Sequence, residues 1–101
     1  MSSNIQISTP FLRSYSHFNT TVGTSLVKVL DYVDIPKKRV SLVVQNQSTG
    51  NQNIYIVLNS TDADGIIIPP LSSYSFDNYN GQIYAKGSAA NAIVHIAESV
   101  V

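Results

Sequence analysis

The residues best suited to chemistry in this sequence are its two histidines, His17 and His95. An imidazole can act as an acid or base near neutral pH and can ligate a transition metal, but each role needs a second polar group nearby. The two lie near opposite ends of the chain, and no Asp or Glu stands at ligand spacing beside either one. His95 alternates with apolar Val94 and Ile96, so we expect it on the opposite face of a strand, exposed or packed in an interface. The histidines therefore predict neither catalysis nor a metal site.

A second candidate is the segment Asp62-Ala63-Asp64-Gly65, which is similar to the front of a calcium-binding loop. An EF-hand also requires flanking helices and a Glu several positions later, whereas a β-rich run begins here at Ile66. We interpret the segment as a turn, with a weak calcium site as the alternative.

Catalytic chemistry finds no further support in the sequence. Cysteine is absent from the 101 residues, which excludes thiolate catalysis, Cys-ligated zinc and disulfides among them. The other carboxylates are scattered, and no serine stands in a nucleophile-elbow motif. We therefore predict a protein that is not an enzyme and uses no cofactor.

Length and charge limit the remaining classes of function. The chain is long enough for one domain with its own core, and only 12% of its residues are charged, about half the usual share. Six Lys and Arg balance six Asp and Glu, so no electrostatic surface for nucleic acid or anionic lipid is expected. The basic run Lys37-Lys38-Arg39 is interpreted as the solvated start of a strand. Without a signal peptide or an apolar run of about 18 residues, we expect a soluble chain made in a cytoplasm.

Short β-type segments separated by turn residues organise the chain, and none has helical periodicity. They cover residues 21–30, 39–46, 53–59, 65–68, 72–77, 82–86 and 92–98. About seven strands at this spacing predict an all-β fold, a single small antiparallel β-sandwich or barrel of jelly-roll-like type.

Residues 72–85 hold the strongest turn signal. Tyr74 and Phe76 alternate with serines, Asn80-Gly81 tolerates positive φ, and the alternation resumes at Ile83. These features predict a β-hairpin. The polar segment 47–53 predicts a second hairpin loop.

The predicted strands carry apolar residues on both faces. The set expected in the core is Val40, Leu42, Ile54, Ile56, Ile66, Ile68, Phe76 and Ile83. The set expected to point outward is Val43, Tyr55, Val57, Ile67, Tyr84 and His95. Tyrosine is enriched at interfaces because it combines a large rigid ring with a polar tip. We interpret the outward set as an assembly interface, with internal cover by the second sheet and the N-terminal segment as the alternative.

Residues 1–20 lack this regularity and are predicted to be an extended N-terminal arm, followed by an antiparallel β domain over 21–101. The segment is rich in Ser, Asn and Thr, and Pro10 disfavours a helix. Docking on a neighbouring molecule and folding onto its own domain are the two alternatives for the arm. Its candidate interface residues are Ile5, Ile7, Phe11, Leu12, Tyr15 and Phe18.

Several stretches of the chain resemble a small domain of tailed-bacteriophage virion proteins. They are RVSLVVQNQS (39–48), NIY (53–55), GIIIPP (65–70), YSF (74–76), NYNGQIYA (78–85) and VHIAE (94–98), and TVGTSLV (21–27) fits the opening strand. The shared pattern is a strand ending in Asn-x-Ser, a second through Ile-Tyr, a strand stopped by prolines, and an aromatic strand leading to Gly-x-Ile-Tyr-Ala.

This resemblance implies a non-enzymatic virion protein, made in the host bacterial cytoplasm. The function expected from it is capsid decoration or cement, with the arm and an apolar sheet face docked on the head. A homo-oligomer, preferably a trimer, and other virion proteins would be the partners, without nucleic acid or membrane. Alternatives are a head-fibre or tail-adaptor module, or a binder of host-surface glycans through Asn78, Tyr79 and Asn80, whose side chains suit stacking on sugars and hydrogen bonding to them.

Overall fold

The chain forms eight β-strands in a computed structural model, which describes residues 14–58 and 65–101. The strands are β1 (Ser14–Val22), β2 (Val27–Leu30), β3 (Arg39–Asn46), β4 (Ile54–Val57), β5 (Ile66–Ile68), β6 (Ser73–Asp77), β7 (Ile83–Gly87) and β8 (Ala92–Val100). Within this described part, no helix is long and apolar enough to cross a membrane.

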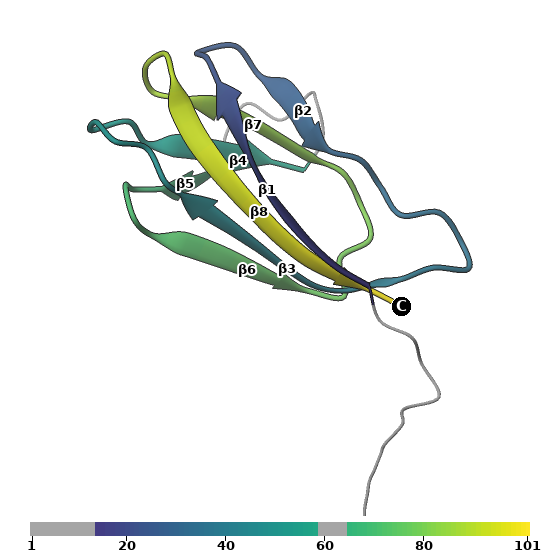
Figure 1. The fold of residues 1–101 in the computed structure, drawn as a ribbon. Coiled ribbons are helices and arrows are strands. Elements are labelled where there is room, and N and C mark those ends of the chain that lie inside the picture. Colours follow the sequence, from purple (N-terminus) through teal and green to yellow (C-terminus); the bar gives the residue numbers. More distant parts are fainter. Residues whose placement is uncertain (1–13, 59–64) are drawn as a thin grey trace, which may run out of the picture.

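Two antiparallel four-stranded sheets face each other, with strand orders β1-β8-β3-β6 and β2-β7-β4-β5 (Figure 1). Every connection except that from β4 to β5 passes from one sheet to the other. Eight strands in two sheets with such crossings are the arrangement of a jelly roll. The all-β, jelly-roll-like prediction is therefore confirmed, and the fold is a sandwich rather than a barrel.

The core lies between the sheets, where alternate residues of the inner strands meet. β7 buries every second side chain throughout, and β3 and β8 do so over residues 42–46 and 92–96, as expected of strands with one face in a core. Each buried aliphatic side chain contributes roughly 1.5–3 kcal/mol. Five residues of the predicted core set are fully buried: Leu42, Ile54, Ile56, Ile68 and Ile83. The other three, Val40, Ile66 and Phe76, are half-buried.

The first strand differs from the expected arm over residues 1–20. Residues 14–22 form β1, which pairs with β8 in unbroken register from Ser14 opposite Val100 to Val22 opposite Ala92. The β domain thus begins at least seven residues earlier than predicted, since it includes residues 14–20. β1 escaped prediction because it lies at the edge of its sheet, where polar residues are tolerated, and only Val22 is buried.

The predicted hairpin over residues 72–85 is wrong. β6 pairs with β3, whereas β7 pairs with β2 and β4 in the opposite sheet. The turn residues 78–82 therefore connect the two sheets, and Asn78 adopts the positive φ of 57° that its residue type tolerates. The segment 47–53 also connects the sheets, because β3 and β4 lie in different ones. There the buried Asn46 side chain donates to the carbonyl oxygens of Gln52 and Ile68, at 2.8 and 2.9 Å.

The prediction that Val57 lies on the outer face is also wrong. It is only 4% exposed. β4 ends at Val57, so the alternation stops there, and the side chain packs beside Gly65, where a Cβ atom would lie 2.9 Å from Val57 Cγ1. The possible calcium ligands Asp62 and Asp64 lie outside the described residues.

Candidate assembly surface

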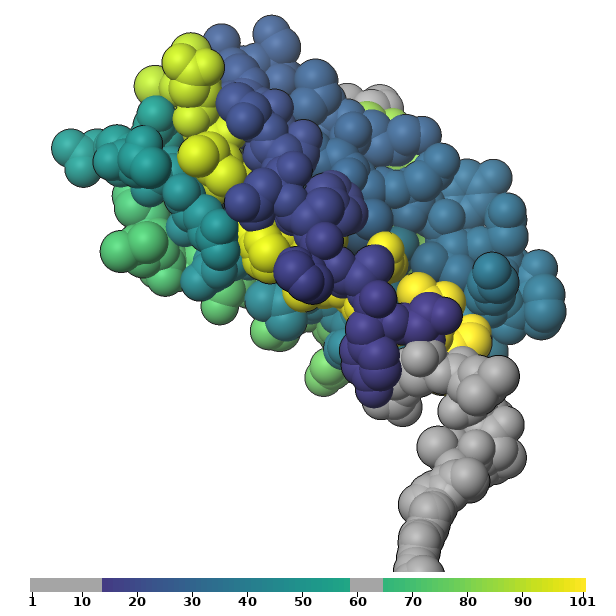
Figure 2. All heavy atoms as spheres, in the orientation of Figure 1, coloured from purple at the N-terminus to yellow at the C-terminus, as the bar shows by residue number. Residues whose placement is uncertain are grey.

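β1 forms one edge of its sheet and lies on the surface over most of its length. In Figure 2 it runs as a purple stripe along the molecule beside β8. Its first six residues are all exposed. Among the residues that the structure describes, β1 pairs only with β8, so the backbone groups of its other side are available for pairing.

β1 lacks the features with which proteins usually protect an edge strand. Such features are short length, charged residues, proline and bulges. The nine residues of β1 contain no Pro, Lys, Arg, Asp or Glu, and the register with β8 has no shift. The other edges are shorter, and two of them are protected: β5 has three residues followed by Pro69-Pro70, and β2 has four residues, a register shift and Lys28. β6 is protected less, since its five residues contain no proline and carry a charge only at the end, Asp77.

The predicted interface residues do not form one surface. Tyr15, His95 and Val43 lie on β1, β8 and β3, and line one shallow groove on the outer face of the first sheet. The second sheet carries the others on its own outer face, on the opposite side of the sandwich: Tyr55, Ile67 and Tyr84. Phe18, opposite Ile96, is 38% exposed at the edge of the first sheet. The arm residues Ile5, Ile7, Phe11 and Leu12 lie outside the described part.

A second hollow lies where β1 begins. This basal groove has a volume of 610 Å³ and is formed by the loop 31–37, by Ser14 and by the end of β8. The loop presents two apolar side chains to solvent, Tyr32 at 60% and Ile35 at 94% exposure. The groove therefore offers an apolar surface directly beside the point where residues 1–13 join the domain.

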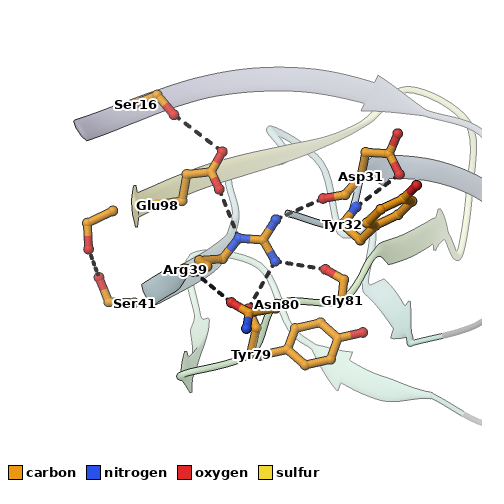
Figure 3. A network of polar contacts seen from close by, with 10 residues as sticks. Ser16, Asp31, Tyr32, Arg39, Ser41, Tyr79, Asn80, Gly81 and Glu98 are labelled. Carbon is orange, nitrogen blue, oxygen red and sulfur yellow. Dashed lines mark hydrogen bonds and ion pairs between the residues drawn. The ribbon is translucent and has the colours of Figure 1, made fainter. Parts of the chain in front are cut away.

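Arg39 lies beside the basal groove and joins several chain segments there by hydrogen bonds (Figure 3). Its Nε donates to Glu98 Oε1 at 2.8 Å, and Nη1 donates to the carbonyl oxygens of Tyr79 and Gly81 at 3.0 and 2.7 Å. Nη2 donates to the carbonyl oxygen of Asp31 at 2.8 Å. The planar, forked guanidinium suits such divergent acceptors. One side chain thus ties together the loop after β2, the segment after β6 and strand β8.

The interpretation of Lys37-Lys38-Arg39 as a solvated run is therefore wrong for its last residue. Lys37 and Lys38 are exposed, but Arg39 is 1% exposed. Its charged partner Glu98 lies 59 residues further along the chain, so no local pattern reveals the pair.

The glycan candidates are mostly engaged within the fold. Tyr79 packs against Phe76, with ring centroids 5.5 Å apart, and its hydroxyl donates to the carbonyl oxygen of Gln82 at 2.7 Å. Burial raises the pKa of the Tyr79 hydroxyl, and the nearby charge of Arg39 opposes the rise. Asn80 Oδ1 accepts the backbone N–H of Arg39 at 2.7 Å. Of the three residues, only Asn78 is exposed without a described side-chain partner.

The fold brings the two histidines together. Their ring centroids lie 5.5 Å apart across β1 and β8, and His95 Nδ1 lies 2.5 Å from Asn19 Oδ1. Sequence reasoning missed this pair because the pairing of the first strand with the last has no local signal. Among the described residues, no group of three or more His, Cys, Asp or Glu side chains could hold a metal ion.

These features define a small jelly-roll-like β-sandwich with one unprotected edge. No family model matches the chain, and none of the curated proteins does. Among solved structures, the chain is similar to a chain from Bacillus endospore appendages, described as a novel family of disulfide-linked pili. The TM-score is 0.65 at 16% sequence identity, and the match covers 96% of this chain and 95% of that chain. This likeness shows the fold.

Proposed function

We propose that this protein is a non-enzymatic structural subunit that assembles in many copies through the open edge of β1. The observation that carries the proposal is the edge itself: nine residues in regular register, without a charge, a proline or a bulge. Such an edge is a template for β-strand addition, in which a strand of another molecule continues the sheet. The chain from Bacillus endospore appendages, which are described as disulfide-linked pili, shares this fold, so the fold is compatible with a subunit of an assembly.

The contact would be made between copies of this chain. The first sheet has two edges, β1 and β6, and β6 carries Tyr74 at 43% exposure. Pairing of β1 with β6 of the next copy is a heterologous contact, which either closes into a ring, such as a trimer, or continues as a filament. Residues 1–13 would add to this contact by docking their apolar side chains in the basal groove of the neighbouring copy. The 101 residues contain no cysteine, so none of them can form a disulfide in this contact.

The resemblance of residues 21–98 to tailed-phage virion domains supports the choice of particle. We propose a virion decoration or cement protein, made in the host cytoplasm, as its finer function. A tail or fibre adaptor is the alternative, which would use the same edge and would differ in copy number. The glycan-binding alternative is weakened by the internal contacts of Tyr79 and Asn80.

The test is the molar mass of the purified chain in solution, measured by light scattering over a range of concentrations and followed by electron microscopy. The wild type should form rings or filaments. The double variant Tyr15→Lys/Thr21→Lys should remain a folded monomer, because both positions are exposed on β1 and lysine blocks edge pairing.

The matched control is Thr24→Lys/Ser25→Lys, which adds the same charge to exposed positions just after β1. It should assemble as the wild type does. A synthetic peptide with the sequence of residues 14–22 should compete with assembly. A wild-type chain that stays monomeric at every concentration, and does not bind the peptide, would refute edge pairing. Mass spectrometry of purified phage particles then decides the finer proposal. Hundreds of copies per particle indicate a cement protein, and about a dozen indicate a tail or vertex protein. Absence of the chain from the particles excludes a virion protein.

A further inference from the structure

His17 and His95 lie diagonally across two paired strands, on the outer face of the first sheet. His17 on β1 is opposite Ala97, and His95 on β8 is opposite Asn19. Alternate residues of a strand share a face, so His17 and Asn19 point the same way, as do His95 and Ala97. The two rings are 5.5 Å apart between centroids and tilted by 46°. The backbone pairing of β1 and β8 therefore holds both imidazoles in one place.

This separation suits two imidazoles that share one metal ion. With metal–nitrogen distances of about 2.0–2.1 Å and tetrahedral angles, two coordinated rings have their centres roughly 5.3 Å apart. The observed 5.5 Å is close to this value. Because β1 and β8 are already paired, rotation of the His17 side chain is the adjustment by which one nitrogen of each ring would reach a common ion.

Asn19 prepares His95 for this role. The side-chain oxygen of Asn19 lies 2.5 Å from His95 Nδ1, and it can only accept a hydrogen bond. The proton of the neutral imidazole is therefore held on Nδ1, and the lone pair remains on Nε2. Histidines that ligate metals usually donate their other N–H to an oxygen in this way, which fixes the tautomer and the orientation of the ring.

The surroundings leave the pair accessible to an ion. Both rings line a shallow groove of 460 Å³ with Tyr15, Val43 and Ala97. His17 is exposed and His95 is half-exposed. Among the described residues, His17 has no hydrogen-bonding partner for its ring, and Nε2 of His95 has none.

We propose that His17 and His95 form a two-histidine binding site for a divalent transition metal ion. Water would complete the coordination. Two imidazole ligands suit Cu²⁺, Ni²⁺ and Zn²⁺, with Cu²⁺ bound most tightly, whereas Mg²⁺ and Ca²⁺ prefer oxygen ligands and do not bind. The site does not depend on the proposed function, since it requires only the folded chain.

The experiment is calorimetric titration of the full chain with NiCl₂ and ZnCl₂, together with thermal unfolding at each metal concentration. One ion should bind per chain. Free metal at a hundred times the dissociation constant should raise Tm by about 10–20 °C, because the unfolded chain does not hold the two histidines together.

Variants separate a two-histidine site from binding to a single ring. His17→Gln and His95→Gln should each abolish the rise in Tm, and each should weaken binding nearly as much as the double variant. Asn19→Ala should weaken binding about tenfold through the lost hydrogen bond, and Asn19→Asp should strengthen it, because a carboxylate is the better acceptor. A purely structural role of Asn19 would alter the stability of the metal-free chain and leave the affinity unchanged.

Gln45→Ala is the matched control, because Gln45 is opposite His95 on β3 and is not a ligand in the proposal. It should leave the affinity within a factor of two. The proposal is overturned if either single histidine variant keeps the affinity of the wild type, or if the metal ions bind without raising Tm.

Discussion

Replacing Arg39 by Met should destabilise the domain severely, although Arg39 stands in a run of three basic residues of which two are exposed. Methionine is close to arginine in length but cannot donate a hydrogen bond. The variant therefore removes the donors of the network and keeps most of the packing. Glu98 and the carbonyl oxygens of Asp31, Tyr79 and Gly81 each lose a partner.

The magnitude follows from these four acceptors. A buried polar group that loses its partner costs about 1–3 kcal/mol, and breaking a buried ion pair on one side costs about 3–5 kcal/mol. Because Asp31 is exposed and the Glu98 side chain is 15% exposed, water can replace part of the loss. We expect the free energy of unfolding to fall by about 3–5 kcal/mol, which for a domain of this size lowers Tm by at least about 12 °C.

Urea unfolding, followed by circular dichroism, measures this loss, and two further variants identify its cause. Lys38→Met removes the same charge from the neighbouring exposed side chain and should change the stability by less than about 0.5 kcal/mol. Arg39→Lys keeps the charge but should still be destabilising, because one ammonium group cannot reach four divergent acceptors.

A double-mutant cycle completes the test. Arg39→Met/Glu98→Gln should recover part of the stability lost in Arg39→Met, because no unpaired carboxylate remains. If Arg39→Met and Lys38→Met differ by less than about 0.5 kcal/mol, the network does not stabilise the fold and the reasoning fails.

Three further predictions concern the core and the tight connections. Tyr79 ionises near pH 10 in the unfolded chain and at higher pH in the folded chain, because burial raises its pKa. The stability that this raised pKa contributes to the fold is complete below about pH 10 and is lost as the pH rises through the folded pKa. Tyr79→Phe should flatten that part of the profile of stability against pH, and an unchanged profile would contradict the assignment. Ile83→Asp should abolish cooperative unfolding because it places a charge in the core, and a normal melting curve would show that the face is wrongly assigned. Gly87→Ala should lower the free energy of unfolding by roughly 1–3 kcal/mol, because the added Cβ would lie 2.6 Å from the Cβ of Ala92. Gly23→Ala is the control, since its Cβ would have no atom within 4 Å, and it should leave the stability nearly unchanged in urea unfolding. Equal effects of the two variants would refute the close approach at Gly87.

Alternation of side chains made the individual strands predictable. β3 and β8 lie inside a sheet and bury one face along most of their length, so Leu42, Val44, Val94 and Ile96 appear in the sequence at every second position. The number of strands was one short because β1 buries only Val22 and has no such pattern.

The sequence could not predict which strands pair with one another, because the strand pairings of this sandwich join distant parts of the chain. Asn80-Gly81 has the chemistry of a hairpin turn, yet the strands on either side belong to different sheets. Turn propensity is a local property and does not specify which strand lies next to which. The same limit hid the ion pair of Arg39 with Glu98 and the contact of His17 with His95.

The position of β8 has a consequence for how the chain matures. β8 lies between β1 and β3 and is made after both, so the first sheet cannot be joined together before β8 has left the ribosome. Until then β1 has no partner in its own sheet, and a nascent or truncated chain cannot present β1 as an ordered edge. The edge formed by β1 therefore becomes ordered only through pairing of residues 70 or more positions apart in the chain, such as Val22 with Ala92, which ties its formation to the non-local contacts that fold slowly.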